Sequence, residues 1–142
     1  MRKRTLAREY ALQMLYEMDI TQDSTERVIQ NFWDYQITSN VAKEVKDFAE
    51  FLTRGVIQNL KDIDNEISKH SQNWKLKRMA VVDRNILRLG SFELLFCKDI
   101  PPKVSINEAI ELAKKFSGQE SARFVNGILD KIKEKRNSNE VC

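Results

Sequence analysis

Cysteine, histidine, proline and glycine are all scarce in this chain of 142 residues. The two cysteines, Cys97 in an apolar run and Cys142 at the end, match neither a disulfide framework nor a metal-ligand spacing. The single histidine, His70, falls near the end of an expected helix, where contact with terminal carbonyls is a more common role than proton transfer. Four glycines and two prolines favour long helices over a β architecture with many turns. We therefore expect an all-helical protein of a reducing compartment.

Catalytic and cofactor-binding motifs are also missing from the sequence. Its four glycines, at positions 55, 90, 118 and 127, form neither a GxxxxGKS/T loop nor a GxGxxG loop. Asp62, Asp64 and Glu66 alternate like the start of a calcium loop, but the required glycine and closing glutamate do not follow, so we interpret them as first-turn acids of a helix. No run approaches the roughly 18 apolar residues that a membrane span needs. The expectation is a cytoplasmic protein that is not an enzyme, with no cofactor, no metal site and no membrane partner.

Positive charge is concentrated at the N-terminal end. Four cations in the first ten residues, set against Glu9, give +3, which equals the formal net charge of the whole chain. A cationic cluster on a packed helix gains affinity for nucleic acid by displacing the counterions of its phosphates. The alternative is a solvated, charged end that only aids solubility. The four cations are Arg2, Lys3, Arg4 and Arg8.

Hydrophobic periodicity predicts helices along most of the chain. With 42% hydrophobic and 32% charged residues, the sequence suits one compact domain over residues 1–142. The segment 79–96 is apolar on nearly every side and should form the central helix. The other expected helices cover about 5–18, a stretch from Asp23, 41–60 with a short continuation to about 70, 106–116, and a last helix capped by Ser121.

Local signals predict how two of these helices begin. Asp23 with Glu26 has the spacing of a capping box, and Ser105 with Glu108 repeats it more clearly, in the S-x-x-E form. In such a box the two side chains bind free backbone N–H groups of the first turn. At the other end of the 106–116 helix, we expect Phe116 on the buried stripe and Gly118 as the terminating residue.

Three groups of residues are candidates for binding. Trp74 with the cations at 75, 77 and 78 can stack a base and hold phosphates, although a Trp that fills a gap between helices is the more common case. Phe124 can stack on an unpaired base and Asn126 can read its edge, whereas the apolar stripe beside Phe124 favours a place in the core. Polar positions of the central helix form either a surface strip or the edge of a protein interface; they are Asp83, Arg84, Arg88 and Glu93.

Several long segments occur together in an order that is typical of one family. They are ALQMLY at 11–16, WKLKRMAVVDRNILRLG at 74–90, FELLF at 92–96, DIPPKV at 99–104, INEAIELAKKF at 106–116 and RFVNGILDK at 123–131. Together with the basic start, these segments resemble NusB transcription antitermination factors over essentially the whole chain. The resemblance implies an all-α fold of about seven helices in two packed bundles that form one compact domain.

The same resemblance implies partners and binding residues. NusB-like proteins bind the boxA element of ribosomal RNA leader and antiterminator transcripts, a single-stranded RNA, together with a ribosomal small-subunit protein called NusE. The pair helps load an antitermination complex onto RNA polymerase. Carried over by position, the RNA-binding residues are Arg2, Lys3, Arg4, Arg8, Gln119, Glu120, Arg123, Phe124 and Asn126, and the partner-facing residues are Asp83 and Arg88.

Two other functions stay open on the sequence. A domain of this kind can position RNA for a separate RNA methyltransferase, although the sequence supplies no methyl-donor pocket. The chain can also act as a homodimeric scaffold through a self-complementary apolar surface.

Overall fold

The computed structural model describes residues 2–71 and 75–141, with side chains as far as residue 136. Within these ranges the chain is helical and contains no β-strand. A π-helical turn, η1, and a 3-10 turn, η2, interrupt the α-helices. The elements are α1 (Lys3–Thr21), α2 (Thr25–Asn31), η1 (Phe32–Gln36), α3 (Lys43–Gln58), α4 (Leu60–His70), η2 (Leu76–Arg78), α5 (Val81–Phe96), α6 (Pro102–Phe116) and α7 (Gln119–Val141).

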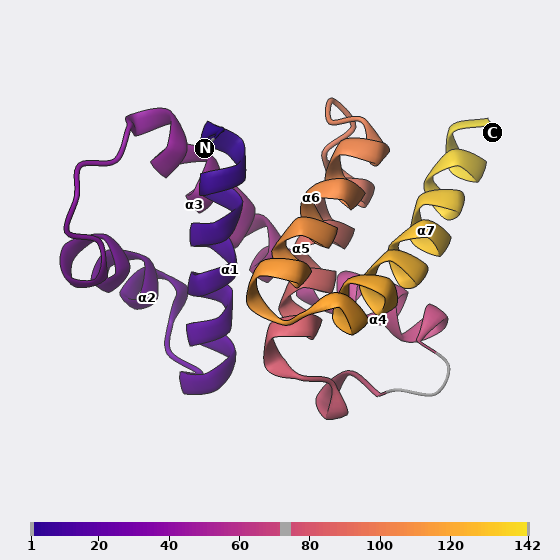
Figure 1. Cartoon of the computed structure of the whole chain (residues 1–142), viewed down its shortest axis with the longest axis horizontal. Coiled ribbons are helices and arrows are strands. Elements are labelled where there is room, and N and C mark those ends of the chain that lie inside the picture. The colour runs from indigo at the N-terminus through magenta and orange to yellow at the C-terminus, as the bar shows by residue number, and fades with distance from the viewer. Residues whose placement is uncertain (1, 72–74, 142) are drawn as a thin grey trace.

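The helices form two bundles that share α1. Figure 1 shows α1, α2 and α3 on one side and α4 to α7 on the other. Ala7, Met14 and Met18 of α1 face the smaller core, between α1, α2, η1 and α3. Leu12 and Leu15 of the same helix face the larger core. Because α1 is apolar on two sides, its position fixes one bundle against the other, and the predicted two-bundle architecture is confirmed.

Helix α5 is the centre of the larger bundle, as its sequence predicts. It packs against α1, α3, α4, α6 and α7. Every residue from position 85 to position 94 is buried except Arg88. Besides Ser91, the buried polar residues here are Asn85 and Glu93, and burying such groups is costly unless they have hydrogen-bond partners. Both have such partners, and those of Glu93 bear directly on the candidate site.

Both predicted capping boxes are wrong. Helix α2 is capped by Ser24, whose hydroxyl accepts a hydrogen bond from the Arg27 backbone N–H at 3.2 Å. Helix α6 begins at Pro102, so Ser105 and Glu108 lie inside it. Proline suits this position because the first helical residue needs no N–H donor. The side chains of Ser105 and Glu108 are thereby left to bind other helices.

The connection between α6 and α7 follows the predicted pattern in part. Gly118 has a φ of +140°, which favours glycine, and its N–H donates to the Ala113 carbonyl at 2.7 Å. Ser121, the expected cap, lies inside α7, where its hydroxyl lies 2.7 Å from that of Ser117. Phe116 is 38% exposed, so the prediction that it is buried is wrong.

Gly55 is the glycine at which we expect an added side chain to destabilise the fold most. A Cβ atom placed there lies 2.1 Å from Cζ of Phe92, so Gly55→Ala must displace that ring. Overpacking of this kind lowers the free energy of unfolding by about 1–3 kcal/mol, which urea denaturation measures. The matched control is Gly127→Ala in α7, where a Cβ meets nothing within 4 Å and the gain in helix propensity is up to about 1 kcal/mol. An unchanged Gly55→Ala variant would contradict this packing.

Candidate nucleic-acid interface

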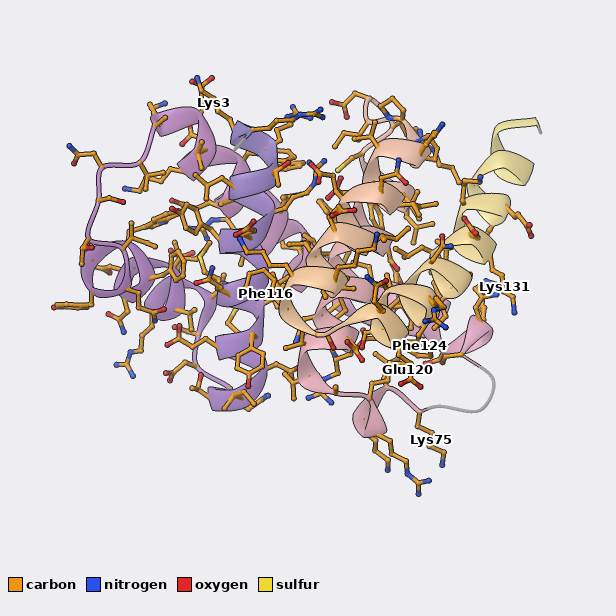
Figure 2. The ribbon with its side chains drawn as sticks, in the orientation of Figure 1. Lys3, Lys75, Phe116, Glu120, Phe124 and Lys131 are labelled. Atoms are coloured by element: carbon orange, nitrogen blue, oxygen red, sulfur yellow. The ribbon has the colours of Figure 1, made fainter. Side chains whose placement is uncertain are left out.

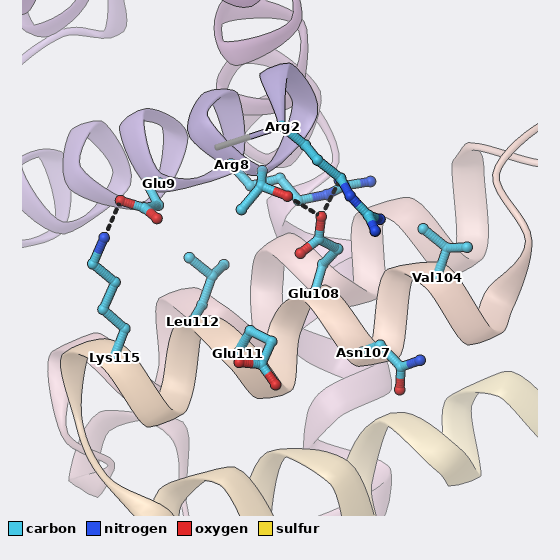
Figure 3. Close-up of a pocket in the computed structure, with 10 residues that line it drawn as sticks. Arg2, Arg8, Glu9, Val104, Asn107, Glu108, Glu111, Leu112 and Lys115 are labelled. Carbon is cyan, nitrogen blue, oxygen red and sulfur yellow. Dashed lines mark hydrogen bonds and ion pairs between the residues drawn. The ribbon is translucent and has the colours of Figure 1, made fainter.

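Three of the four predicted N-terminal cations are exposed at the start of α1. The Arg4 guanidinium lies 4.3 Å from the centre of the Phe48 ring, and Lys3 forms an ion pair with Glu44 of α3. Arg2 lines a groove of about 560 Å³ between α1 and α6 (Figure 3). These contacts leave the three cations at the surface on a helix that is packed on both sides, which confirms that a structured element presents them.

Arg8 is the exception, because it is buried rather than presented to solvent. Its Nε and Nη2 donate to the two carboxylate oxygens of Glu93 at 2.8 and 2.7 Å. Its Nη1 donates to Glu108 at 3.1 Å. Burial lowers the pKa of Arg8, but the hydrogen bonds and charges of Glu93 and Glu108 outweigh it, so the pKa is raised. The prediction that Arg8 belongs to an exposed cationic cluster is therefore wrong.

The acceptors of Arg8 are themselves held by other helices. Ser105 of α6 donates to Glu93 at 2.9 Å, and Thr5 of α1 donates to Glu108 at 2.5 Å. Two turns further along α6, Lys115 reaches back to Glu9 of α1 at 2.8 Å (Figure 3). This polar network joins α1, α5 and α6 and fixes the direction in which the exposed cations point.

The second predicted RNA-binding set lies at the start of α7. Gln119, Glu120 and Arg123 are exposed, and Phe124 and Asn126 are half-buried. Phe124 packs partly against the larger core, and it also lines a pocket of about 330 Å³ between α7 and the start of α5. The core interpretation of Phe124 is therefore met in part, and its role in binding stays a prediction. The other lining residues are Arg78, Met79, Ala80, Asp83, Glu120 and Ser121.

The two predicted RNA-binding sets are not neighbours. Figure 2 shows Lys3 at the upper edge of the molecule and Glu120 with Phe124 in its lower right part. An RNA that contacts both sets must cross the surface between these two parts. Trp74, the aromatic residue of the candidate segment that includes the cations at 75, 77 and 78, lies outside the described residues.

Arg88, predicted to face a protein partner, lies in an internal network instead. Its Nε and Nη2 donate to Asp64 at 2.9 and 3.0 Å, and its Nη1 donates to Asp19 at 3.0 Å. Arg84 donates to the same Asp19 at 2.6 and 2.7 Å. Burial raises the pKa of Asp19, but the hydrogen bonds of Arg84 and Asn85 and the charge of Arg88 outweigh it and lower the pKa. Only 13% of the Arg88 side chain is exposed, so its guanidinium is used to join α1, α4 and α5.

Asp83, the other predicted partner-facing residue, is half-buried at the start of α5. Its Oδ2 accepts a hydrogen bond from Ser121 of α7 at 3.1 Å. The neighbouring residue Val82 lines a different, largely apolar groove. Asp83 therefore lines the α7 pocket, and its neighbour Val82 lines this second groove.

The second groove is a candidate functional feature that sequence reasoning missed. It has a volume of about 410 Å³, and its lining includes Tyr16, Ile20 and Phe116, which are 41%, 55% and 38% exposed. Exposed apolar groups gathered in one place are typical of a protein interface. A signal was present in the sequence, because Tyr16 and Ile20 are four residues apart on α1 but outside its buried stripe.

The residues considered for catalysis or metal binding are either paired with other side chains or buried. The Nε2 of His70, at the end of α4, lies 3.5 Å from a carboxylate oxygen of Glu66. Glu66 also pairs with Lys135 of α7, so its interpretation as a first-turn acid is wrong. Burial raises the pKa of the Cys97 thiol to about 11, as its apolar sequence context predicts. In the described ranges, no group of three or more His, Cys, Asp or Glu side chains has a metal-binding arrangement.

These features define a class of protein: a small helical protein with an exposed cationic end and a separate apolar groove. None of its described helices is both long enough and apolar enough to traverse a lipid bilayer. The chain belongs to the NusB family, because the sequence model of that family matches residues 5–134.

Relatives and solved structures of similar sequence agree with this assignment. A transcription antitermination protein NusB from Anaeromyxobacter dehalogenans is 50% identical over 130 residues, which cover 92% of this chain and 89% of that protein. The NusB of Chloroherpeton thalassium is 44% identical over 123 residues, and the match spans 87% of this chain but only 57% of that longer protein. T. maritima NusB is 38% identical, with a TM-score of 0.82 over 94% of this chain and 92% of that one.

One solved structure of this kind is a complex of the antitermination factors NusB and NusE with double-stranded RNA. Its matching chain is 29% identical to this protein, with a TM-score of 0.83 over 95% of this chain and 98% of that one.

Proposed function

We propose that this protein is a transcription antitermination factor without catalytic activity of its own. It binds boxA-type single-stranded RNA of ribosomal RNA leader transcripts together with the ribosomal small-subunit protein NusE. The resulting pair helps load an antitermination complex onto RNA polymerase. Family membership and the solved NusB and NusE complex with RNA support this proposal.

The observation that carries the proposal is the exposed cationic end of a rigid helix. Arg2, Lys3 and Arg4 stand at the surface, while Arg8 holds the same helix in place through Glu93 and Glu108. Cations that are already positioned lose little conformational freedom when they bind phosphates. Such contacts supply affinity that does not depend on sequence and that falls steeply with salt.

Sequence preference requires contacts with bases, and α7 is the proposed source. The Phe124 ring is half-buried beside an open pocket, so a base can stack on its free part. Gln119, Glu120, Arg123 and Asn126 lie on the same first two turns of α7 and complete the proposed RNA-binding set.

The proposed NusE surface is the apolar groove lined by Tyr16, Ile20 and Phe116. An aromatic and an aliphatic side chain that are each about half exposed can become fully desolvated in an interface, where such residues carry much of the binding energy. Asp83 follows Val82, which lines this groove, and a charge beside an interface sets orientation more than affinity. Arg88 contributes only by fixing α5.

The experiment that tests the proposal is an RNA-binding titration with and without NusE. We expect the protein with NusE to bind boxA RNA more tightly than a scrambled RNA of equal length and charge. An equal affinity for both RNAs would reduce the proposal to non-specific binding. Recovery of an RNA methyltransferase, rather than a ribosomal protein, in a pull-down would favour the alternative role of positioning RNA for an enzyme.

A further inference from the structure

The short turn η2 presents three cations on a backbone that is firmly anchored. Met79 is buried in the larger core, and Leu76 packs against that core. The Leu76 carbonyl accepts hydrogen bonds from the Met79 N–H at 3.1 Å and from Arg84 at 3.3 Å. The side chains between and beside these anchors are exposed: Lys75, Lys77 and Arg78.

These three cations have no carboxylate partner within the described part of the chain. By contrast, Arg8, Arg54, Arg84 and Arg88 each form an ion pair with a carboxylate. The family resemblance assigns no role to η2. An unpaired cationic turn held in a fixed position is a surface that can neutralise phosphates.

The cations adjoin the pocket at the start of α7. Arg78 lines that pocket together with Phe124, Asp83 and Glu120. Figure 2 shows Lys75, Glu120 and Phe124 at the same end of the molecule, away from Lys3. The pocket volume of about 330 Å³ lies within the range of 300–1,000 Å³ that is typical of ligand sites.

Charge distribution decides how an RNA strand lies across these two features. The carboxylates of Asp83 and Glu120 repel a phosphate from the pocket, and the Phe124 ring offers a surface on which a neutral base can stack. The phosphates on either side of that base then fall on the cationic turn. This division between an aromatic platform and a cationic track is typical of single-strand binding.

We propose that η2 and the start of α7 form one site for single-stranded RNA, in which Lys75, Lys77 and Arg78 bind phosphates and Phe124 stacks on a base. This inference rests on the proposed RNA-binding function and adds a second phosphate-binding surface, remote from the N-terminal cations. Two linked contacts on one strand strengthen each other, because the second binds at a high effective concentration.

The test is the Lys75→Ala/Lys77→Ala variant, with NusE present. We expect its affinity for boxA RNA to fall on the order of tenfold at moderate salt, and the slope of log affinity against log salt to become shallower by about 1.4, or 0.7 for each lost contact. The matched control, Arg27→Ala/Lys61→Ala, removes two exposed cations from α2 and α4 and should bind like the unmodified protein. Both lysines of the test variant are exposed, so thermal unfolding should not change.

Three results would overturn this inference, and one of them would also overturn the proposed function. If the unmodified protein does not bind RNA, the proposed function fails as well. If the unmodified protein binds but the variant and the control have equal affinity and equal salt slopes, only the η2 site is wrong. If the variant binds RNA normally but loses affinity for NusE in the absence of RNA, the turn is a protein-binding surface instead.

Discussion

Replacing Arg8 by alanine is expected to lower the free energy of unfolding by about 3–5 kcal/mol, because it leaves a buried carboxylate without its partner. Glu93 is 1% exposed, and two of the hydrogen bonds that it accepts come from Arg8. Glu108 loses a third hydrogen bond from the same guanidinium. Since small domains have a total stability of about 5–15 kcal/mol, this loss is a large part of the whole. Urea denaturation followed by circular dichroism measures it.

Two further variants show that the cause is the buried charge rather than the loss of one cation. Arg2→Ala removes an exposed cation from the same end of α1 and should change the free energy of unfolding by less than about 0.5 kcal/mol. Arg8→Met/Glu93→Leu removes both buried charges and should recover much of the stability, because a buried pair is often replaceable by apolar groups. A loss below about 1 kcal/mol for Arg8→Ala would contradict the buried network.

The second large effect is expected for Ile20→Glu, which places a charge in the middle of the proposed NusE surface. Ile20 is 55% exposed, so the variant should fold normally. In an interface, however, the new carboxylate must be desolvated, and the loss of an apolar anchor costs about 2 kcal/mol or more, which is roughly a thirtyfold weaker affinity. Isothermal titration of NusE into the variant measures the change.

Tyr35→Glu is the control for this variant. Tyr35 is 78% exposed in η1 and does not line the groove, so the same charge placed there should leave NusE affinity unchanged. Equal NusE affinity for Ile20→Glu and the unmodified protein would move the interface elsewhere on the surface.

The positions of the helices are the part of the fold that the sequence predicts well. Burial repeats with the helical period, so the nearly continuous apolar surface of the 79–96 segment predicts the central helix α5. The expected short continuation to about residue 70 is the separate helix α4, which begins at Leu60 after α3 ends at Gln58.

Local polar patterns predict less, because tertiary contacts compete for the same side chains. Ser105 and Glu108 have the spacing of a capping box, yet they bind Glu93 and Arg8, which are 12 and 100 residues away. Arg8 looks like one of four equal cations in the sequence, but it lies one turn further along the same face of α1 than Arg4, where Glu93 and Glu108 bind it. Charge in a sequence gives the number of cations but not which of them have buried partners.

The candidate site shows the same limit for apolar residues. Phe116 continues the apolar pattern of α6, but it lies at the helix end, beyond the cover of α1 and α5, and therefore faces the groove. Tyr16 and Ile20 join it from α1. This groove is lined by residues that are far apart in the sequence, so it depends on how the helices meet. Periodicity within one helix does not describe such a contact.

The central claim is that the exposed N-terminal cations bind the phosphates of RNA. The most direct test compares the Arg2→Ala/Lys3→Ala/Arg4→Ala variant with the unmodified protein, each with NusE, in boxA RNA titrations at several salt concentrations. The account predicts weaker binding at low salt, a salt slope that is shallower by about 2, and affinities that converge at high salt, because each phosphate contact on a single strand contributes about 0.7 to the slope. Equal affinities and equal slopes at every salt concentration would contradict it.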